Sequence, residues 1–164
     1  MIAALDVHYD DSTKRATAGA VVFAQWTNAL PTAEHTAAVE GIQPYVPGEF
    51  FRRELPCLIA VIGKFASPVD VLVVDGYVHF DSKPALGQHL FEHFQRRIPV
   101  IGVAKTRFRG ASAVEVLRGR SKLPLHVTAA DIDVIEAAER IKQMHGPHRI
   151  PTLLKRVDQL ARRG

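Results

Sequence analysis

The stretch from Ile2 to Tyr9, IAALDVHY, places a single acidic residue, Asp6, behind an apolar run. This composition is typical of a buried β-strand, and the polar residues 10–13 that follow are typical of a turn. Residues 17–24 then form a second run that is rich in Ala and Val. We therefore expect an N-terminal antiparallel hairpin with a carboxylate inside its first strand.

The rest of the sequence predicts alternating strands and helices. Apolar runs typical of buried strands lie at residues 70–75 and 99–104, and residues 114–117 and 125–128 are expected to pair with each other. A short strand is also expected at 26–30. Helices are expected at residues 31–39, 56–64, 86–97, 128–145 and 151–163. This order predicts an α/β fold, in which a mixed β-sheet carries helices on both faces.

Two of these helices have an expected starting signal. Pro56 is tolerated in the first turn of a helix, so the second helix is expected to begin there. Thr128-Ala129-Ala130-Asp131 resembles a capping box with Asp in place of Glu, which would open the helix that follows. The prolines at 44 and 47 exclude a regular helix between them.

Length and composition indicate one soluble globular domain spanning residues 1–164. The chain has 164 residues, of which 47% are hydrophobic, and contains no linker-like stretch or internal repeat. It has no run of about 18 apolar residues and no signal-peptide pattern, so we expect a cytoplasmic protein with no membrane association. The single cysteine, Cys57, is expected to be a small core residue rather than a nucleophile.

Charge is distributed unequally along the chain. Residues 1–82 hold 5 Lys/Arg and 10 Asp/Glu, whereas residues 83–164 hold 16 and 7. If both halves fold together, a basic surface lies beside an acidic region, which suits a polyanion such as nucleic acid. The alternative is a basic surface that serves solubility only.

Three carboxylates occupy positions where a charge is costly to bury. Asp6 lies in the first strand, Asp75 ends the run 71–74, and Glu54 lies next to the second expected helix. A carboxylate on a core element needs a compensating cation or hydrogen-bond donor. We therefore expect Asp6, Glu54 and Asp75 to share one Mg²⁺ or Mn²⁺ ion, as in a metal-dependent nuclease.

Four motifs together resemble the endonuclease V family. They are Ala-Leu-Asp6, the segment Pro44-Tyr45-Val46-Pro47-Gly48 with Arg53-Glu54 after it, Val-Val-Asp75-Gly76, and Ile101-Gly102-Val-Ala-Lys105. Their order and spacing are similar to those of the family over most of the chain, and Arg149-Ile-Pro-Thr152 resembles its closing segment. The resemblance implies a ribonuclease H-like fold.

The resemblance also implies site residues. Asp6, Glu54 and Asp75 match the catalytic, metal-binding carboxylates, and Lys105 matches a lysine that contacts the scissile phosphate. Tyr45, between Pro44 and Val46-Pro47-Gly48, matches a wedge that fills the gap left by an extruded base. Gly76 and Gly102 match positions that present main-chain groups to that base, with Phe50 as an apolar wall and Arg53 in the same binding segment. Arg107 and Arg109 are either phosphate contacts or ordinary exposed charges.

The implied function is DNA repair. The family cleaves a phosphodiester bond on the 3′ side of deoxyinosine or inosine, using water activated by Mg²⁺ or Mn²⁺. The expected partner is therefore DNA, or RNA, with a deaminated base, and the expected state is a monomer. A second interpretation is an endonuclease V-like module that binds altered or branched nucleic acid without cutting it.

The sequence departs from the family at two motifs. After Asp75-Gly76 the family histidines are replaced by Tyr77-Val-His79-Phe-Asp81, so His79 or Asp81 is a candidate for a changed metal shell and, alternatively, a loop residue. Thr128-Ala-Ala-Asp131 stands in place of a late histidine turn, which makes Asp131 either a metal-shell carboxylate or a helix cap. We expect the cap.

A different enzyme class also has a short motif here. His89, Glu92 and His93 match the His-x-x-Glu-His pattern of some zinc peptidases, in which two histidines on one helix share a Zn²⁺ ion. The sequence offers no third ligand with supporting context. The zinc-peptidase interpretation is therefore secondary.

Overall fold

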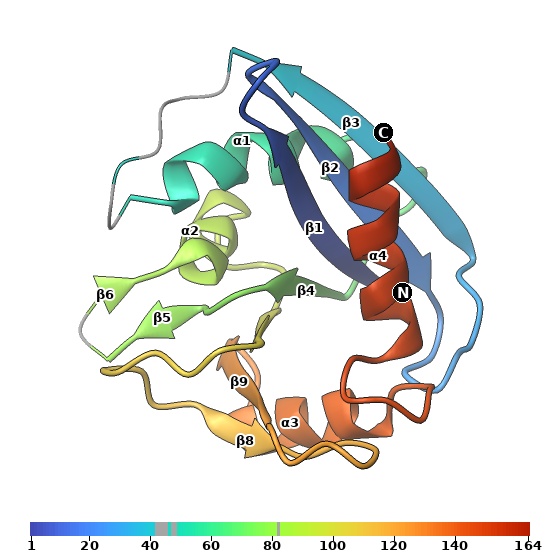
Figure 1. Cartoon of the computed structure of the whole chain (residues 1–164), viewed down its shortest axis with the longest axis vertical. Helices are drawn as coiled ribbons and strands as arrows, with labels where there is room; N and C mark the ends of the chain where they lie inside the picture. Colours follow the sequence, from blue (N-terminus) through green and yellow to red (C-terminus); the bar gives the residue numbers. More distant parts are fainter. Residues whose placement is uncertain (42–45, 47–48, 82) are drawn as a thin grey trace.

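A seven-stranded mixed sheet forms the centre of the computed structural model, which describes residues 1–41, 46, 49–81 and 83–164 (Figure 1). Its order is β3-β2-β1-β4-β7-β9-β8. The strands are β1 (Ile2–Asp10), β2 (Arg15–Phe23), β3 (Ala33–Glu40), β4 (Val71–Asp75), β7 (Val100–Ala104), β8 (Val114–Val116) and β9 (Leu125–Ala130). A separate ladder joins β5 (His79–Phe80) to β6 (Lys83–Pro84).

The centre of the sheet contains both strand directions. β1 is antiparallel to β2 and parallel to β4, and β4 is parallel to β7. The carboxyl ends of β1, β4 and β7 therefore point the same way, so residues at these ends meet at one edge of the sheet. The expected N-terminal hairpin and mixed sheet are confirmed.

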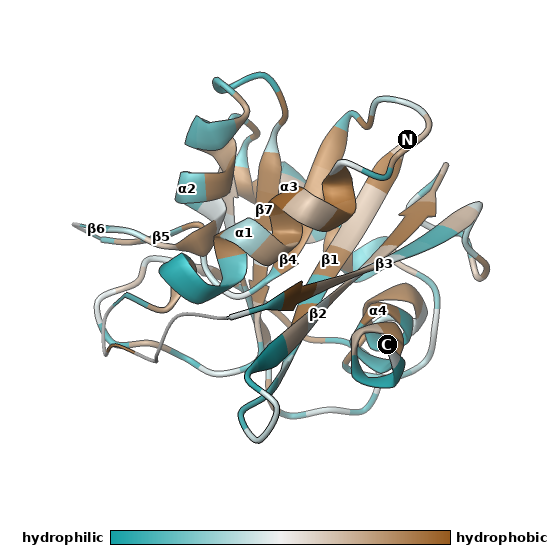
Figure 2. Cartoon of the chain, turned by 90° about the horizontal axis from the view of Figure 1, so that it is seen from above, coloured by the Kyte–Doolittle hydropathy of each residue, from teal (hydrophilic) through white to brown (hydrophobic). Residues whose placement is uncertain are grey.

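Helices cover both faces of the sheet, as expected (Figures 1 and 2). They are α1 (Phe51–Ile62), α2 (Leu86–His93), α3 (Val134–Gln143) and α4 (Thr152–Arg163). Ala3 and Leu5 of β1 face the core formed with α1 and α2, whereas Ile2 and Ala4 face the core formed with α3 and α4. Because side chains alternate along a strand, Asp6 continues the series that faces α4.

A glycine allows α4 to lie directly over the hairpin. Gly19 is the β2 partner of Asp6. A Cβ atom on Gly19 would lie 3.0 Å from the backbone N of Ala161 and 3.1 Å from the Val157 carbonyl oxygen. The missing side chain thus lets the α4 backbone approach the strand next to Asp6, which brings residues of α4 to this edge.

The third strand, β3, lies where the sequence predicts a helix. Residues 31–39 were expected to be helical, but Ala33–Glu40 form β3, which pairs antiparallel with β2 along its length. Pairing with an exposed edge of the hairpin outweighs the helical composition. The short strand expected at 26–30 is also wrong: Asn28 accepts hydrogen bonds from the Ala24 and Gln25 N–H groups, and this bonding closes a turn.

Two helix starts were also wrong. α1 begins at Phe51, with Pro56 inside it, because Leu55 and Leu58 pack on the core and offset the missing hydrogen bond. Thr128 lies buried in β9, and α3 is capped by Asp133, whose carboxylate accepts from the Ile135 and Glu136 N–H groups at 3.0 Å. The expected helical cap at residues 128–131 is therefore the end of a strand.

In the described part of the chain, no helix is both long and apolar enough to span a membrane.

Candidate active site

Asp6 and Asp75 lie on neighbouring strands at the same edge of the sheet. Asp6 is in β1, and its Oδ1 accepts a hydrogen bond from the Val7 N–H at 2.8 Å. Asp75 is the last residue of the parallel strand β4. Burial, and then the charge of Asp75, raise the pKa of Asp6 to about 7. The two residues line the same crevice, so their carboxylates are near enough to repel each other.

Glu54 approaches these two residues from α1. It lies within the first turns of the helix and is 7% exposed. Burial, followed by the charges of Asp6 and Asp75, raises the pKa of Glu54 well above its usual value, although Arg53 lowers it. Three acids from β1, α1 and β4 thus form one electrostatically coupled group, which we call the acid cluster.

Lys105 supplies a positive charge to one member of the acid cluster. It follows β7, and its Nζ donates to Asp75 Oδ2 at 2.5 Å. Burial lowers the pKa of Lys105, but the hydrogen bond and the charges of Asp75 and Asp6 raise it above its usual value. One ammonium group therefore acts on both Asp75 and Asp6, and Asp6 also shares a hydrogen bond with the Asp158 side chain. Glu54 makes no ion pair with the described residues, although the charge of Arg53 acts on it.

The chemistry of the acid cluster fits a divalent cation. Carboxylate oxygens are the preferred ligands of Mg²⁺, and their mutual repulsion is what a cation would relieve. Asp6, Asp75 and Lys105 line a crevice of about 20 Å³, room for one water-sized particle, together with eight apolar residues. As the side chains stand, however, no three His, Cys, Asp or Glu residues of the described chain are grouped closely enough to hold a metal.

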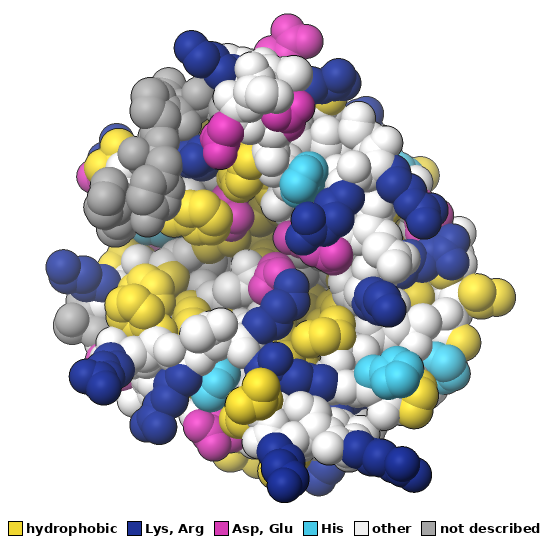
Figure 3. Space-filling model, viewed as in Figure 1, with side chains coloured by type: hydrophobic (Ala, Val, Ile, Leu, Met, Phe, Trp, Pro, Cys, Tyr) yellow, Lys and Arg dark blue, Asp and Glu magenta, His cyan; other side chains and the backbone are white. Residues whose placement is uncertain are grey.

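An aromatic pocket opens beside the acid cluster and has a volume of about 380 Å³. This volume is within the range of about 300–1,000 Å³ found for small-ligand sites. Glu54 and Asp75 contribute its acidic wall. The other residues around it are Phe50, Phe51, Gly76, Tyr77, Phe80, Pro84, Ala85, Leu86 and Phe108. Figure 3 shows acidic side chains at the centre of this face, with basic and hydrophobic groups around them.

The two glycines expected at the base-binding position lie differently. Gly76 lines the aromatic pocket with φ of +129°, and a Cβ atom there would meet no atom within 4 Å. Gly102 lies behind it in β7, where a Cβ atom would come within 2.6 Å of the Gly76 carbonyl oxygen. Gly76 therefore offers its backbone to the pocket, while Gly102 allows β7 to pack against it.

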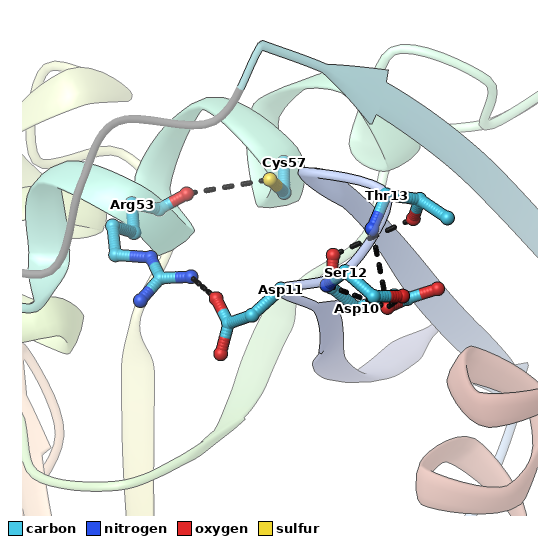
Figure 4. A network of polar contacts seen from close by, with 6 residues as sticks. All are labelled: Asp10, Asp11, Ser12, Thr13, Arg53 and Cys57. Atoms are coloured by element: carbon cyan, nitrogen blue, oxygen red, sulfur yellow. Dashed lines mark hydrogen bonds and ion pairs between the residues drawn. The ribbon is translucent and has the colours of Figure 1, made fainter.

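The remaining expected binding residues fall into two groups. Phe50 lines the aromatic pocket and Val46 is exposed, whereas Tyr45, Pro44, Pro47 and Gly48 lie outside the described residues. Arg53 is buried and pairs with Asp11 of the hairpin turn at 2.9 Å (Figure 4). Its guanidinium lies over the Tyr9 ring. The ion pair with Asp11 connects α1 to the hairpin, and the Arg53 side chain does not line the aromatic pocket.

The residues at the two motif departures are not grouped with the acids. Asp81 is exposed and its Oδ1 accepts from the Ser112 N–H and Oγ–H. His79 belongs to β5. Asp131 follows the end of β9 that pairs with Val100, whereas the acid cluster lies at the Ala104 end of β7. Because the strands run antiparallel, Asp131 lies at the opposite edge of the sheet, and Asp133 makes the helix cap instead.

Three residues near Lys105 were missed from the sequence. Asp158 of α4 acts on both Asp6 and Lys105 through its charge. His148 and Arg149 line a cavity with Lys105 and Asp158, and Arg149 also donates to the Lys105 carbonyl oxygen. In the sequence Arg149 belongs to the closing motif, and no pattern points to Asp158 or His148. Asp158 lies here because α4 packs closely on β1 and β2, whereas Arg149, which precedes α4, is held by its bonds to the Lys105 and Pro124 carbonyl oxygens.

Two alternative chemistries lack support in the geometry. In α2, Glu92 bonds to Arg96 and Gln88, and His89 stacks on Phe51 with ring centroids 3.7 Å apart. No third metal ligand joins them in the described chain. Cys57 is buried, its Sγ donates to the Arg53 carbonyl oxygen at 3.3 Å (Figure 4), and burial raises the pKa of its thiol to about 11. A thiol of that kind is a poor nucleophile.

Comparison with known proteins identifies relatives. The sequence model of the endonuclease V family matches residues 1–145. Endonuclease V of Streptomyces avermitilis is 31% identical over 99% of this chain and 79% of that protein. A match to endonuclease V of Xanthomonas axonopodis, at 32% identity, covers 69% of this chain and 47% of that protein, which is less than two thirds of its length.

Solved structures agree with the sequence match. The crystal structure of the Streptomyces avermitilis endonuclease V superposes with a TM-score of 0.79 at 30% identity, covering 99% of this chain and 79% of that one. Endonuclease V of Ciona intestinalis was solved in complex with a 24mer DNA containing an inosine followed by a ribo-adenosine. It superposes with a TM-score of 0.80 at 18% identity, covering 99% of this chain and 84% of that one. The expected ribonuclease H-like fold is confirmed. The chain belongs to the endonuclease V family.

Proposed function

We propose that this protein is a metal-dependent endonuclease that cleaves a phosphodiester bond on the 3′ side of a deaminated base in DNA or RNA. The observation that carries the proposal is the position of the acid cluster beside the aromatic pocket, with Asp75 contributing to both. A nuclease that selects a base needs a charged site for the phosphate and an apolar site for the extruded base. These two sites share one edge of the sheet.

The residues have separate proposed roles. Asp6, Glu54 and Asp75 would hold Mg²⁺, or Mn²⁺ in its place, and the ion when bound supplies an activated water and stabilises charge on the phosphate. Lys105, which is partly exposed, is positioned to face the phosphate and stabilise its developing charge. The basic half of the chain contributes Arg149 and Lys155 next to Lys105, which favours binding of the nucleic-acid backbone.

The base would enter the aromatic pocket. Phe50, Phe80 and Phe108 offer ring faces for stacking, and Gly76 brings a backbone close enough to bond a base edge. Tyr45 remains a proposed wedge, from the family motif alone. The Ciona intestinalis relative crystallised with inosine-containing DNA supports inosine as the first base to test.

The test is cleavage of matched oligonucleotides. Single-stranded DNA, duplex DNA and RNA, each with and without one inosine, are incubated with Mg²⁺, Mn²⁺ or EDTA, and the products are mapped. We expect cleavage in either metal, at the second phosphodiester bond 3′ to the inosine, and none in EDTA. Cleavage that is equal in EDTA, or equal with and without inosine, would contradict the proposal.

One observation favours a second candidate, a module that binds such nucleic acid without cutting it. Lys105 is bonded to Asp75, and the acid cluster as it stands is too open to hold a metal. If that arrangement persists with substrate, the ammonium replaces the ion. Tight, inosine-dependent binding with no product in Mg²⁺ or Mn²⁺ would establish this candidate.

A further inference from the structure

Tyr77 joins two loops that leave the sheet next to each other. It follows Asp75-Gly76 at the end of β4, and its hydroxyl donates to the Thr106 carbonyl oxygen at 2.8 Å and accepts from the Phe108 N–H at 3.0 Å. Thr106 and Phe108 belong to the loop after β7, which begins at Lys105. Because Tyr77 is buried, water does not readily replace these bonds when they are lost.

The backbone that carries Tyr77 is fixed on several sides. The Tyr77 and Val78 carbonyl oxygens accept from the Gly87 and Gln88 N–H groups in the first turn of α2, at 3.1 and 2.9 Å. The Val78 N–H donates to Thr128 Oγ1 in β9 at 2.8 Å. The phenol ring of Tyr77 therefore extends from an anchored point, and its hydroxyl restrains the other loop rather than moving with it.

Asp81 makes a second tie between the same loops. Its N–H donates to the Gly110 carbonyl oxygen at 2.7 Å. Its Oδ1 accepts from the Ser112 N–H at 2.6 Å and from the Ser112 hydroxyl at 2.8 Å. Residues 106–112 are thus held by Tyr77 near one end and by Asp81 near the other.

The restrained loop contributes one wall of the aromatic pocket. Phe108 is 49% exposed, and its backbone N–H is held by the Tyr77 hydroxyl. Its centroid lies 4.3 Å from that of Phe80 and 6.4 Å from that of Tyr77. An exposed ring fixed in advance loses little conformational entropy when it meets a ligand.

We propose that Tyr77 and Asp81 are positioning residues that hold residues 106–112 so that Phe108 keeps its place in the wall of the aromatic pocket. They act on selection of the modified base and leave the hydrolytic step to the acid cluster. This inference rests on the proposed function for its effect on selection of the modified base, but the hydrogen bonds of Tyr77 and Asp81 can be tested without substrate.

The first measurement is hydrogen exchange of the loop amides in Tyr77→Phe, which removes the hydroxyl and keeps the ring. We expect exchange at the Phe108 N–H to increase by roughly 3- to 10-fold, the factor that corresponds to one net hydrogen bond. Tyr9→Phe is the matched control, because the Tyr9 hydroxyl is buried without a hydrogen-bond partner among the described residues. Unchanged exchange at Phe108 in Tyr77→Phe would overturn the inference.

The second measurement separates selection from hydrolysis. For Tyr77→Phe we expect the ratio of kcat/KM on inosine-containing and unmodified strands to fall by roughly 3- to 10-fold, and kcat to change by a smaller factor than this ratio. Asp81→Ala should behave similarly, whereas Asp81→Asn, which retains an acceptor oxygen for Ser112, should keep most of the preference. A fall in kcat with an unchanged preference would overturn the positioning role.

Binding in EDTA distinguishes failure of this inference from failure of the proposed function. The ratio of Kd values for unmodified and inosine-containing strands should fall in Tyr77→Phe by the same factor as the cleavage preference. Wild-type protein that neither cuts nor prefers the inosine strand would refute the proposed function and the role in selection together. A wild type that prefers inosine, and a Tyr77→Phe variant that retains the full preference, would refute this inference alone.

Discussion

The acid cluster and the aromatic pocket are adjacent but are built in different ways. The acids lie on two strands and a helix, so their backbone positions are set by the sheet and by helix packing. Five of the eleven described residues around the aromatic pocket lie in loops, and the loop that carries Phe108 is held by side-chain hydrogen bonds from Tyr77 and Asp81. Strands and a helix thus position the charged side chains, whereas a loop positions Phe108 in the wall of the aromatic pocket. Loops tolerate sequence change more readily than the elements that they connect.

The sharpest test of this division removes one acid. Asp75→Asn should lower the cleavage rate by at least ~10³-fold, since a metal ligand is lost, while the inosine strand still binds better than its unmodified counterpart. Asp70→Asn is the matched control, because Asp70 precedes the other end of β4 and pairs with the N-terminus. Near-normal cleavage by Asp75→Asn in Mg²⁺ would remove Asp75 from the acid cluster's proposed role.

Lys105 tests whether the charge next to the acids serves the phosphate. Lys105→Ala should reduce kcat by roughly 10²- to 10³-fold, because a positioned cation stabilises charge that develops during cleavage. Lys122→Ala removes an exposed lysine elsewhere and controls for net charge. If cleavage increases in Lys105→Ala, the bond from Lys105 to Asp75 is inhibitory and its proposed role is wrong.

Phe50 tests the pocket side of the comparison. Phe50→Ala should lower the inosine preference by roughly 10-fold, the loss expected when a base stacks on one aromatic ring fewer, with a smaller effect on kcat. Leu123→Ala, which truncates an exposed apolar residue away from the pocket, serves as the control. A variant with full preference and slow hydrolysis would show that the two sites are not separable.

The pH dependence of stability tests the burial of Asp6 directly. Its folded-state pKa of about 7 is above the model-compound value of 3.8, so the folded state holds a proton that the unfolded state releases. The stabilising contribution is complete below about pH 4 and is lost as the pH rises through about 7. The contribution of Asp6 to the free energy of unfolding in EDTA should therefore fall over this window, by about 1–2 kcal/mol because Asp6 is partly exposed, and Glu54, whose pKa is also raised, adds to the decrease.

Asp6→Asn should flatten that decrease, and added Mg²⁺ should offset it in the wild type at pH 8. Urea denaturation in EDTA at several pH values measures both effects. Asp131→Asn is the control, since Asp131 is exposed at the opposite edge of the sheet and Asn tolerates its positive φ of 58°. An identical pH profile for wild type and Asp6→Asn would contradict the coupling.

The smallest expected effect concerns the tie between α1 and the hairpin. Asp11→Ala breaks the ion pair with Arg53, yet should cost no more than about 1 kcal/mol, because the Asp11 side chain is 84% exposed and the buried guanidinium keeps the Tyr9 ring and the charge of Glu54 beside it. Chemical denaturation of the wild type and Asp11→Ala measures the difference. A loss of several kcal/mol, or a large loss of cleavage, would show that Arg53 depends on Asp11 to hold Glu54 in the acid cluster.

The sequence alone was sufficient for the central elements. Strong apolar runs predicted β1, β2, β4 and β7, and two acidic residues at the ends of such runs pointed to a shared cation. Motif spacing then indicated the family. The strand predictions are confirmed because burial and its cost for a charge act locally, within a few residues of each side chain, whereas the shared cation stays a prediction.

Tertiary structure decided what local patterns could not. β3 forms because the hairpin offers an edge to pair with, Thr128 lies in a strand because β9 pairs with β7, and Asp133 is left to cap α3. Likewise, the bond between Lys105 and Asp75, and the proximity of Asp158 to Asp6, depend on strand order and helix packing. Contacts between residues far apart in the chain outweigh local preferences of a few tenths of a kcal/mol per residue, and only the folded chain brings them together.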